Sequence, residues 1–406
     1  MDIYQCVVPL YNASKVWGLS PFEIIRINDK DNCMKRLRIS TIGILYSIFM
    51  CILITISVLY VLITKSSYYL EKDFSANAIS LVISFLSLTS SALSAEIGCV
   101  LNRERLLFLL ETIFEFETIF HRHRFNTFIK FEIFIAYTTI ILLSIYDIWL
   151  WGIYYRLDLD FFPYLLIHFI MITMIIQYTN IIYLTYDNFK FMNLSLVKDI
   201  SKMYKIRPYV NKNNVFVLSH KRELIDMTNS DINKNSITCQ GIRNNFVSKL
   251  RDYRRYHYAL HNICDDVNKV FGFQIIFFVL TFFISITRDI FYGLYFVLTV
   301  NSEVRGSVLV VVEQFCWTMI MVVELIAITV VCHLACAEAM HTGVILRNIL
   351  FHEPLNTMLS AEIQVFLEQI HNRPLRYSAC GLFNIDLAML CSFIGTVATY
   401  IIVLIQ

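Results

Sequence analysis

Residues 374–406, PLRYSACGLFNIDLAMLCSFIGTVATYIIVLIQ, decide how the whole sequence is interpreted. Most of the stretch is apolar, and it is long enough for a helix that crosses a hydrocarbon core, which takes about 20 residues. One face of that helix is small or weakly polar at alternating spacings of three and four, and it carries Ser392, Gly395, Thr399, Ile402 and Gln406. We expect this face to line a pore. The alternative is a helix–helix contact, because Gly395 and Thr399 allow close approach.

Composition supports a membrane setting for the rest of the chain. Of 406 residues, 57% are hydrophobic and 16% are charged, whereas a soluble chain carries about 25% charged residues. The composition therefore predicts an all-α polytopic membrane protein and excludes an ordinary soluble domain.

Seven apolar runs meet the length needed to span a bilayer. The connections after the first, third and fifth runs are short, and the others are long and polar. The runs cover roughly residues 39–64, 74–101, 128–154, 161–186, 269–298, 308–335 and 379–406.

Lys and Arg predict the orientation, because cytoplasmic loops carry an excess of them. The N-terminal segment and the loops 102–127, 187–268 and 336–378 together hold 27 Lys and Arg, and the other side holds four. Without the longest loop, 187–268, the ratio is still 13 to four. We therefore expect a cytoplasmic N-terminus and an extracellular C-terminus. That orientation is opposite to that of G-protein-coupled receptors.

Four parts follow from this topology. Residues 1–38 form a cytoplasmic segment in which VWGLSPF, residues 16–22, is interpreted as an anchor at the membrane interface. Residues 39–335 form a six-helix ligand-binding bundle, interrupted at 207–240 by an Asn-, Lys- and Ser-rich stretch that we expect to be mobile. Residues 336–378 form cytoplasmic anchor helices, and 379–406 form the pore helix. Helices are also expected to extend the spans at Arg103 to Phe120, Phe189 to Tyr204 and from Phe246 into the fifth span.

Polar and aromatic side chains gather in the predicted outer halves of spans three to six. Charged groups inside a membrane are costly and often functional, and indole and phenol rings with a few fixed polar groups suit a small organic ligand. The structural alternative is that Arg288 pairs with Asp147 or Glu313, and that Trp149 and Trp151 belong to an interfacial belt. The candidate ligand-binding residues are Asp147, Trp149, Trp151, His168, Gln177, Arg288, Asp289, Glu313, Gln314 and Trp317.

Other chemistries find little support. Cys332-His333-x-x-Cys336 has no second ligand pair, so we expect no metal. The basic and aromatic residues near Arg251, Arg254 and Arg255 are typical of a solvated face beside a membrane rather than of a nucleic-acid surface. The sequence has no nucleotide-binding or hydrolase fingerprint, which argues against an enzyme and against a bound cofactor.

The ending of the sequence resembles a family signature. Thr399-Tyr400, five apolar residues and Gln406 resemble the TY-hhhhh-QF signature of insect gustatory receptors, although the sequence ends before the closing Phe. The segment YSACGLF at 377–383, followed by Ile385-Asp386, is similar to the entry into the last helix of that family. Span count, length and orientation agree with the resemblance.

The resemblance implies a ligand-gated cation channel in the plasma membrane of sensory neurons. It implies a homotetramer, or a heteromer with other gustatory receptors, around a central pore that needs no G protein, with Ile402 and Gln406 nearest the gate. The ending is more similar to receptors of bitter or plant-derived compounds than to sugar receptors. The alternatives are a sugar receptor, an insect odorant receptor subunit and, from another class, a secondary transporter, which would need related halves and interrupted helices.

Overall fold

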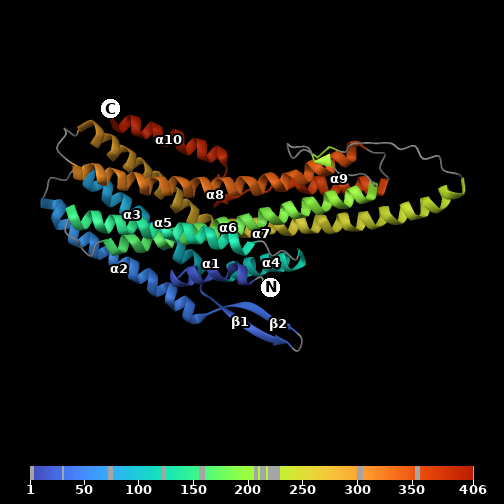
Figure 1. The fold of residues 1–406 in the computed structure, drawn as a ribbon, viewed down its shortest axis with the longest axis horizontal. Helices are drawn as coiled ribbons and strands as arrows, with labels where there is room; N and C mark the ends of the chain where they lie inside the picture. The colour runs from blue at the N-terminus through green and yellow to red at the C-terminus, as the bar shows by residue number, and fades with distance from the viewer. Residues whose placement is uncertain are drawn as a thin grey trace. The chain divides into compact units, whose positions relative to one another are not determined.

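The protein is described by a computed structural model that covers residues 4–29, 32–71, 76–120, 125–154, 161–204, 209–210, 216–217, 229–299, 305–352 and 357–405. Within these ranges the chain is mostly helical (Figure 1). Three two-stranded antiparallel hairpins interrupt the helices. The predicted helical class is therefore confirmed.

Among the residues that the structure describes, six helices are long and apolar enough to cross a membrane, and they correspond to the first six predicted spans. All six combine a long apolar run with a low content of charge, as bilayer-spanning helices must. They are α2 (Thr41–Glu71), α3 (Ala76–Leu101), α5 (Phe125–Tyr154), α6 (Phe161–Tyr204), α7 (Asn229–Thr299) and α8 (Arg305–His352).

The seventh apolar helix is α10 (Leu387–Ile405), which begins at Leu387 rather than at the predicted residue 379. Residues before it form a hairpin of β5 (Ser378–Ala379) and β6 (Phe383–Asn384). The hairpin turns through Cys380 and Gly381, both with positive φ, a conformation that ends a helix or strand and favours glycine. The local backbone therefore delays the start of the helix.

The start of α10 is fixed by a cap and by α7. Asp386 is the N-cap of α10, because its Oδ1 accepts a hydrogen bond from the Met389 N–H at 2.9 Å. A Cβ atom built on Gly272 of α7 would lie 2.8 Å from the backbone nitrogen of Cys380. Glycine at 272 therefore allows the hairpin to approach α7 closely.

Three helices are far longer than a bilayer is thick. Helices α6, α7 and α8 have 44, 71 and 48 residues, and at ~1.5 Å per residue even the shortest exceeds twice the ~30 Å hydrocarbon core. The predicted extensions of these helices are confirmed. Helix α4 (Arg103–Phe120) follows α3 directly, and helical hydrogen bonds join the two at Asn102, whose N–H donates to the Gly98 carbonyl and whose carbonyl accepts from the Leu106 N–H.

The stretch 207–240, predicted to be a mobile loop, is partly helical. Helix α7 already begins at Asn229. Before it lie two short paired strands, β3 (Tyr209–Val210) and β4 (Phe216–Val217). The remaining residues of this stretch lie outside the described part of the chain.

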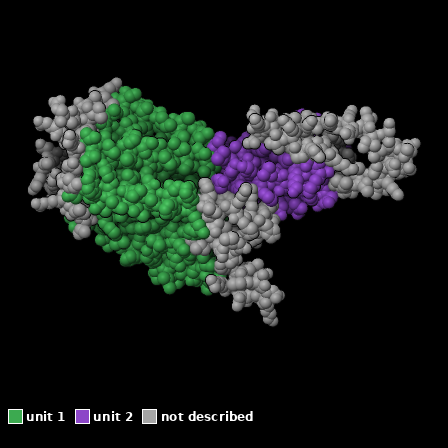
Figure 2. Space-filling model, viewed as in Figure 1, with its two compact units in different colours: residues 1–182, 265–332, 377–406 green, residues 183–264, 333–376 purple. Residues whose placement is uncertain are grey.

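The chain divides into two compact units, coloured separately in Figure 2. Unit 1 comprises residues 1–182, 265–332 and 377–406, and unit 2 comprises 183–264 and 333–376. Residues 39–335 were predicted to form a single bundle of helices. The structure instead groups the extensions of α6 and α7 with the end of α8 and with α9 (Thr357–Asn372).

Helix α6 lies at the centre of unit 1. Of its most apolar window, 89% is buried, against 28% for α2 and 22% for α5. The outward surfaces of α2 and α5 are rich in exposed Ile, Leu and Phe, which is the surface expected where lipid rather than water surrounds a helix. Unit 1 therefore has an inner helix and an apolar periphery.

The N-terminal segment is more structured than the sequence analysis predicted. It forms α1 (Tyr4–Val16) and a hairpin of β1 (Phe22–Asp29) with β2 (Asn32–Ile39). Between them, Trp17 stacks on Phe169 of α6 with centroids 4.8 Å apart, and Leu19 is fully buried. The interpretation of 16–22 as an interfacial anchor is thus wrong, because these side chains pack inside unit 1.

Unit 2 has a core of apolar side chains. Helix α9 is amphipathic as predicted, and it buries Leu359, Ile363 and Phe366. They pack with residues of the other three helices of the unit: Leu196, Ile200, Phe246, Val247, Leu250, Ile345, Leu346 and Ile349. Ion pairs at the edge of this core join α6 to α7 and α7 to α9.

Candidate functional site

Side chains from four helices of unit 1 form what we call the polar cluster. It contains four charged groups, three rings and one hydroxyl within a largely apolar unit. Its members are Asp147 on α5, Tyr164 and His168 on α6, Arg288 and Asp289 on α7, and Glu313, Trp317 and Thr318 on α8.

Asp147 and Trp317 join α5 to α8. The indole Nε1 of Trp317 donates to Oδ2 of Asp147 at 2.9 Å. The Trp317 ring packs on His168 with centroids 4.3 Å apart, and His168 meets Tyr164 edge-on at 5.1 Å. Glu313 brings a second carboxyl group into interaction with Asp147. A carboxyl group thus lies beside a run of aromatic rings.

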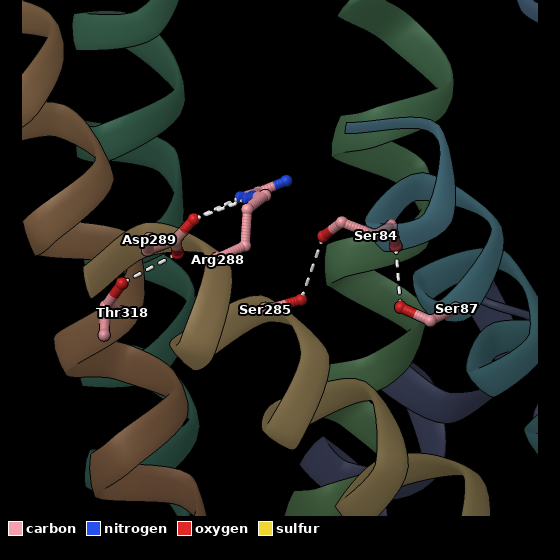
Figure 3. A network of polar contacts seen from close by, with 6 residues as sticks. All are labelled: Ser84, Ser87, Ser285, Arg288, Asp289 and Thr318. Carbon is pink, nitrogen blue, oxygen red and sulfur yellow. Dashed lines mark hydrogen bonds and ion pairs between the residues drawn. The ribbon is translucent and has the colours of Figure 1, made fainter. Parts of the chain in front are cut away.

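Arg288 pairs with its neighbour Asp289 rather than with Asp147 or Glu313. Its Nε donates to Oδ1 of Asp289 at 2.7 Å, and the second oxygen of Asp289 accepts from Thr318 Oγ1 at 2.7 Å (Figure 3). Arg288 also hydrogen-bonds with Tyr164 of α6. Charge-assisted bonds of this kind are stronger than neutral ones, so they tie α6, α7 and α8 together.

A second set of buried hydroxyls, the polar seam, continues along α3 and α7. Ser84 and Ser285 lie 3.2 Å apart, and Ser91 and Thr281 lie 2.8 Å apart. Thr281 also donates to the Ser87 carbonyl at 2.8 Å. Ser285 precedes Arg288 by one helical turn, so the seam leads to the polar cluster (Figure 3).

The seam, Tyr164 and Thr318 were not predicted from the sequence. A signal was present in the sequence, because serines at 84, 87, 91 and 94 recur at spacings of three and four within one apolar helix. Hydroxyls at helical spacing are typical of contacts between membrane helices. Tyr164 and Thr318 carry no such pattern and are identified only by their partners.

Several predicted ligand residues lie apart from the cluster. Gln177 donates to Ser14 Oγ of α1 at 2.5 Å, so its amide holds the N-terminal segment. Trp149 is half exposed and stacks on Tyr146. Gln314 is half-buried, and its Oε1 accepts no hydrogen bond from the described residues. Trp151 belongs to α5, but its side chain lies outside what the structure describes.

Helix α10 exposes most of its surface. Ser392, Gly395, Thr399 and Ile402 are all exposed, whereas Gln406 lies outside the described residues. Among the described residues of α10, Val397 alone is fully buried. The predicted stripe is therefore open to a partner, to lipid or to water.

Aromatic contacts attach α10 to α7. Phe283 meets Phe393 edge-on at 6.0 Å and Tyr400, of the TY pair, edge-on at 5.4 Å. Edge-to-face pairs stabilise a contact beyond the area that they bury. Tyr400 therefore packs against α7, away from the stripe.

Metal chemistry has no centre in the described part of the chain. Nowhere there do three His, Cys, Asp or Glu side chains come together as metal ligands. In the Cys332-His333-x-x-Cys336 segment, the buried Cys332 thiol lies 3.5 Å from the hydroxyl of Tyr178.

The sequence is similar to known chemosensory receptors. The profile of the family described as "7tm Chemosensory receptor" matches residues 8–406. Among individual proteins, "Gustatory receptor for sugar taste 43a" of Drosophila melanogaster is 33% identical over 95 residues, which is 23% of this chain and 22% of that receptor. "Putative gustatory receptor 28b" of the same organism is 29% identical over 155 residues, 36% of this chain and 32% of the relative. The matches thus span under a third of each relative's length.

The fold is similar to that of a solved insect olfactory receptor. The structure of OR5 from Machilis hrabei in complex with eugenol matches with a TM-score of 0.64, covering 98% of this chain and 97% of that one. OR5 without that ligand matches with a TM-score of 0.62. Sequence identity is 12% and 13%, so these matches concern the fold alone.

Proposed function

We propose that this chain, which belongs to the 7tm chemosensory receptor family, is an insect gustatory receptor that works as a ligand-gated cation channel. Family members are receptors, so the chain is not an enzyme. Its six long apolar helices agree with a membrane protein. The proposed location is the plasma membrane of a sensory neuron.

In the proposed topology, α10 is the seventh span and the N-terminus is cytoplasmic. The excess of Lys and Arg on one side supports this orientation. The ends of α6, α7 and α8 that form unit 2 would then lie in the cytoplasm as an anchor between subunits. Their apolar core and the ion pairs at its edge suit an aqueous surrounding.

The exposed stripe of α10 is the observation that carries the proposal. Ser392, Gly395 and Thr399 present hydroxyls and a bare backbone on a helix that is otherwise apolar, and the chain leaves them uncovered. Four copies of such a helix would enclose a pore that polar groups line, with Ile402 and Gln406 narrowing it when closed. Widening of an apolar constriction allows water and ions to enter.

The polar cluster is the proposed ligand site. It combines rings with fixed hydrogen-bonding groups, as sites for small organic molecules do. Bitter or plant-derived compounds are the favoured class. A sugar is the second candidate, because a sugar-taste receptor shares 33% identity over 95 residues.

Helix α7 is the proposed link between site and pore. Asp289 bonds Thr318 of α8, and Phe283, less than two turns away on α7, packs on Tyr400 of α10. A ligand that alters the cluster would shift α7 and thereby α10. Its effect is limited to its preference for the open state.

The proposal is tested by recording currents from the chain expressed alone, without added G protein. Bitter compounds and sugars are applied in turn, and external cations are replaced to measure selectivity. Ile402→Ala on the stripe is compared with Ile394→Ala, a matched residue of similar exposure (58% and 60%) off the stripe.

We expect Ile402→Ala to raise the unliganded current or alter selectivity, and Ile394→Ala to leave both unchanged. A pore-lining role for α10 would be refuted by equal behaviour of the two variants at equal surface expression. Ligand-evoked current that appears only when a G protein is supplied would overturn the channel mechanism.

A further inference from the structure

One oxygen of Asp147 has no hydrogen-bond donor among the residues that the structure describes. The side chain is 2% exposed, and its Oδ2 accepts the Trp317 hydrogen bond. Its Oδ1 is buried and accepts no hydrogen bond from the described residues. A buried carboxylate oxygen normally has a donor, and leaving one without costs free energy. An N–H group of a ligand would supply the donor that Oδ1 lacks among the described residues.

The nearby cation does not supply that donor. Arg288 is held by Asp289, with two of its nitrogens on one oxygen, and by Tyr164. Glu313 is itself a carboxyl group and hydrogen-bonds with Asp147, and two carboxyl groups that share one proton still carry one negative charge between them. The local charge thus favours a positively charged partner.

The surrounding rings favour an organic cation over a hydrated ion. Trp317 contacts Asp147 through its indole N–H, and its ring packs on His168. Aromatic faces attract ammonium groups, most strongly where water is excluded. The described residues also offer no group of three metal-ligating side chains here.

We propose that the polar cluster recognises a protonated amine, whose N–H donates to Oδ1 of Asp147 while its carbon skeleton lies against the ring of Trp317. The inference rests on the proposed function, because it names the ligand class for the same site. The polar cluster would then bind amine-bearing compounds in preference to sugars. A polyol or a neutral aromatic compound at this site is the competing outcome.

Binding is measured on the purified full-length chain, by the thermal shift that each compound causes. The probes are matched pairs, 2-phenylethylamine with 2-phenylethanol and tryptamine with tryptophol, together with fructose. N,N,N-trimethyl-2-phenylethylammonium keeps the charge but has no N–H. We expect the amines to bind at least about tenfold more tightly than the alcohols, because each charged hydrogen bond is worth a factor of this order, and the trimethylated probe to be weaker than the amine.

Two variants test whether the preference for amines depends on Asp147. Asp147→Asn removes the charge with little change of shape, and it should abolish the preference for amines. Glu132→Gln is the control, since Glu132 is an acid of the same helix that accepts a hydrogen bond from Asn180 at 3.0 Å, away from the cluster. It should leave the preference intact. The probe series on the unmodified chain decides the question even if Asp147→Asn does not fold.

Alcohols or fructose binding as tightly as the amines would overturn the inference, and so would a full preference for amines in Asp147→Asn. These outcomes are separate from the channel proposal, because binding is read without current. Amine binding with no current under any ligand counts against the channel alone. Fructose-evoked current without amine binding counts against the amine site alone.

Discussion

The two units of this chain differ in where their charged side chains lie. Unit 2 has an apolar core with ion pairs at its edge, as a protein in water does. Unit 1 encloses the hydroxyls of the polar seam and the charges of the polar cluster behind an apolar periphery. In lipid there is no hydrophobic force between helices, so packing and interhelical hydrogen bonds hold them. The contrast assigns different stabilising interactions to the two units, and each assignment can be tested.

The largest effect is expected at the ion pair of unit 1. Arg288→Met would leave Asp289 as a buried charge without its cation, which costs about 3–5 kcal/mol. Thermal unfolding of the purified chain measures it. The double variant Arg288→Met, Asp289→Asn should recover most of the loss, because replacing both partners of a buried pair is often neutral. A double variant as unstable as the single would show that packing, and not charge, is what Arg288 supplies.

The matching test in unit 2 removes aliphatic volume. Ile363→Ala empties a fully buried position of α9, and we expect a loss of about 3 kcal/mol in the free energy of unfolding. Val365→Ala, two residues along and 44% exposed, should change it by less than about 0.5 kcal/mol. Denaturant or thermal unfolding gives both values. Similar losses for the two variants would mean that this core does not hold α9.

Elements of the fold that depend on a single segment could be predicted from the sequence, and those that depend on distant contacts could not. Hydropathy predicted seven apolar spans, and the first six correspond to long apolar helices. Helical spacing predicted the extensions of the spans and the amphipathic helix α9, because each is encoded within its own segment. The β5–β6 hairpin was not predicted, because its residues were read as part of the apolar run of the last helix. The turn depends on the positive φ of Cys380 and Gly381, which hydropathy does not indicate. The burial of Trp17 was missed because it depends on Phe169, distant in sequence.

The candidate site was predicted in part for the same reason. Charges stand out against an apolar background, so Asp147, Arg288 and Asp289 could be found one by one. Their pairing could not, because either of two distant acids fitted Arg288 as well as its neighbour did. Gln177 was placed with the ligand residues because its partner Ser14 belongs to a segment with no predicted structure.

Replacing a buried glycine by alanine should have opposite effects on stability in the two units. A Cβ atom at Gly98 of α3 would lie 2.0 Å from Nε2 of Gln274, which is fully buried. Gly98→Ala should therefore cost about 1–3 kcal/mol through overpacking. At Gly343 in unit 2 the Cβ atom would meet Ile370 at an ordinary 3.7 Å, so Gly343→Ala should stabilise its helix by up to about 1 kcal/mol.

Thermal unfolding again measures both glycine variants, and Gln274→Ala provides the control. Added to Gly98→Ala, it removes the side chain that the new methyl group strikes, so the combined loss should be smaller than the sum of the two. Strictly additive losses would indicate that Gly98 is needed for another reason.

A smaller effect is expected at the polar seam. A double-mutant cycle of Ser91→Ala and Thr281→Val isolates their 2.8 Å contact. Hydrogen bonds between membrane helices contribute about 0.6 kcal/mol each, so the coupling energy should be of that order. A coupling near zero would mean that the seam is held by close packing of small side chains.

The smallest effect is expected at the border of unit 2. Lys249 donates to Asp199 at 3.0 Å, and the lysine side chain is half exposed. Exposed ion pairs contribute about 0.2–1 kcal/mol, so Lys249→Ala should lower the free energy of unfolding by that amount at low salt. Lys198 of α6 is exposed too, and Lys198→Ala, the control, should lower it by less. At 1 M salt the screening length falls to ~3 Å, so the difference in stability between Lys249→Ala and Lys198→Ala should shrink. The coupling energy between Ser91 and Thr281 should not change, because both groups are uncharged. An ion pair insensitive to salt would place the border of unit 2 in an environment like that of unit 1.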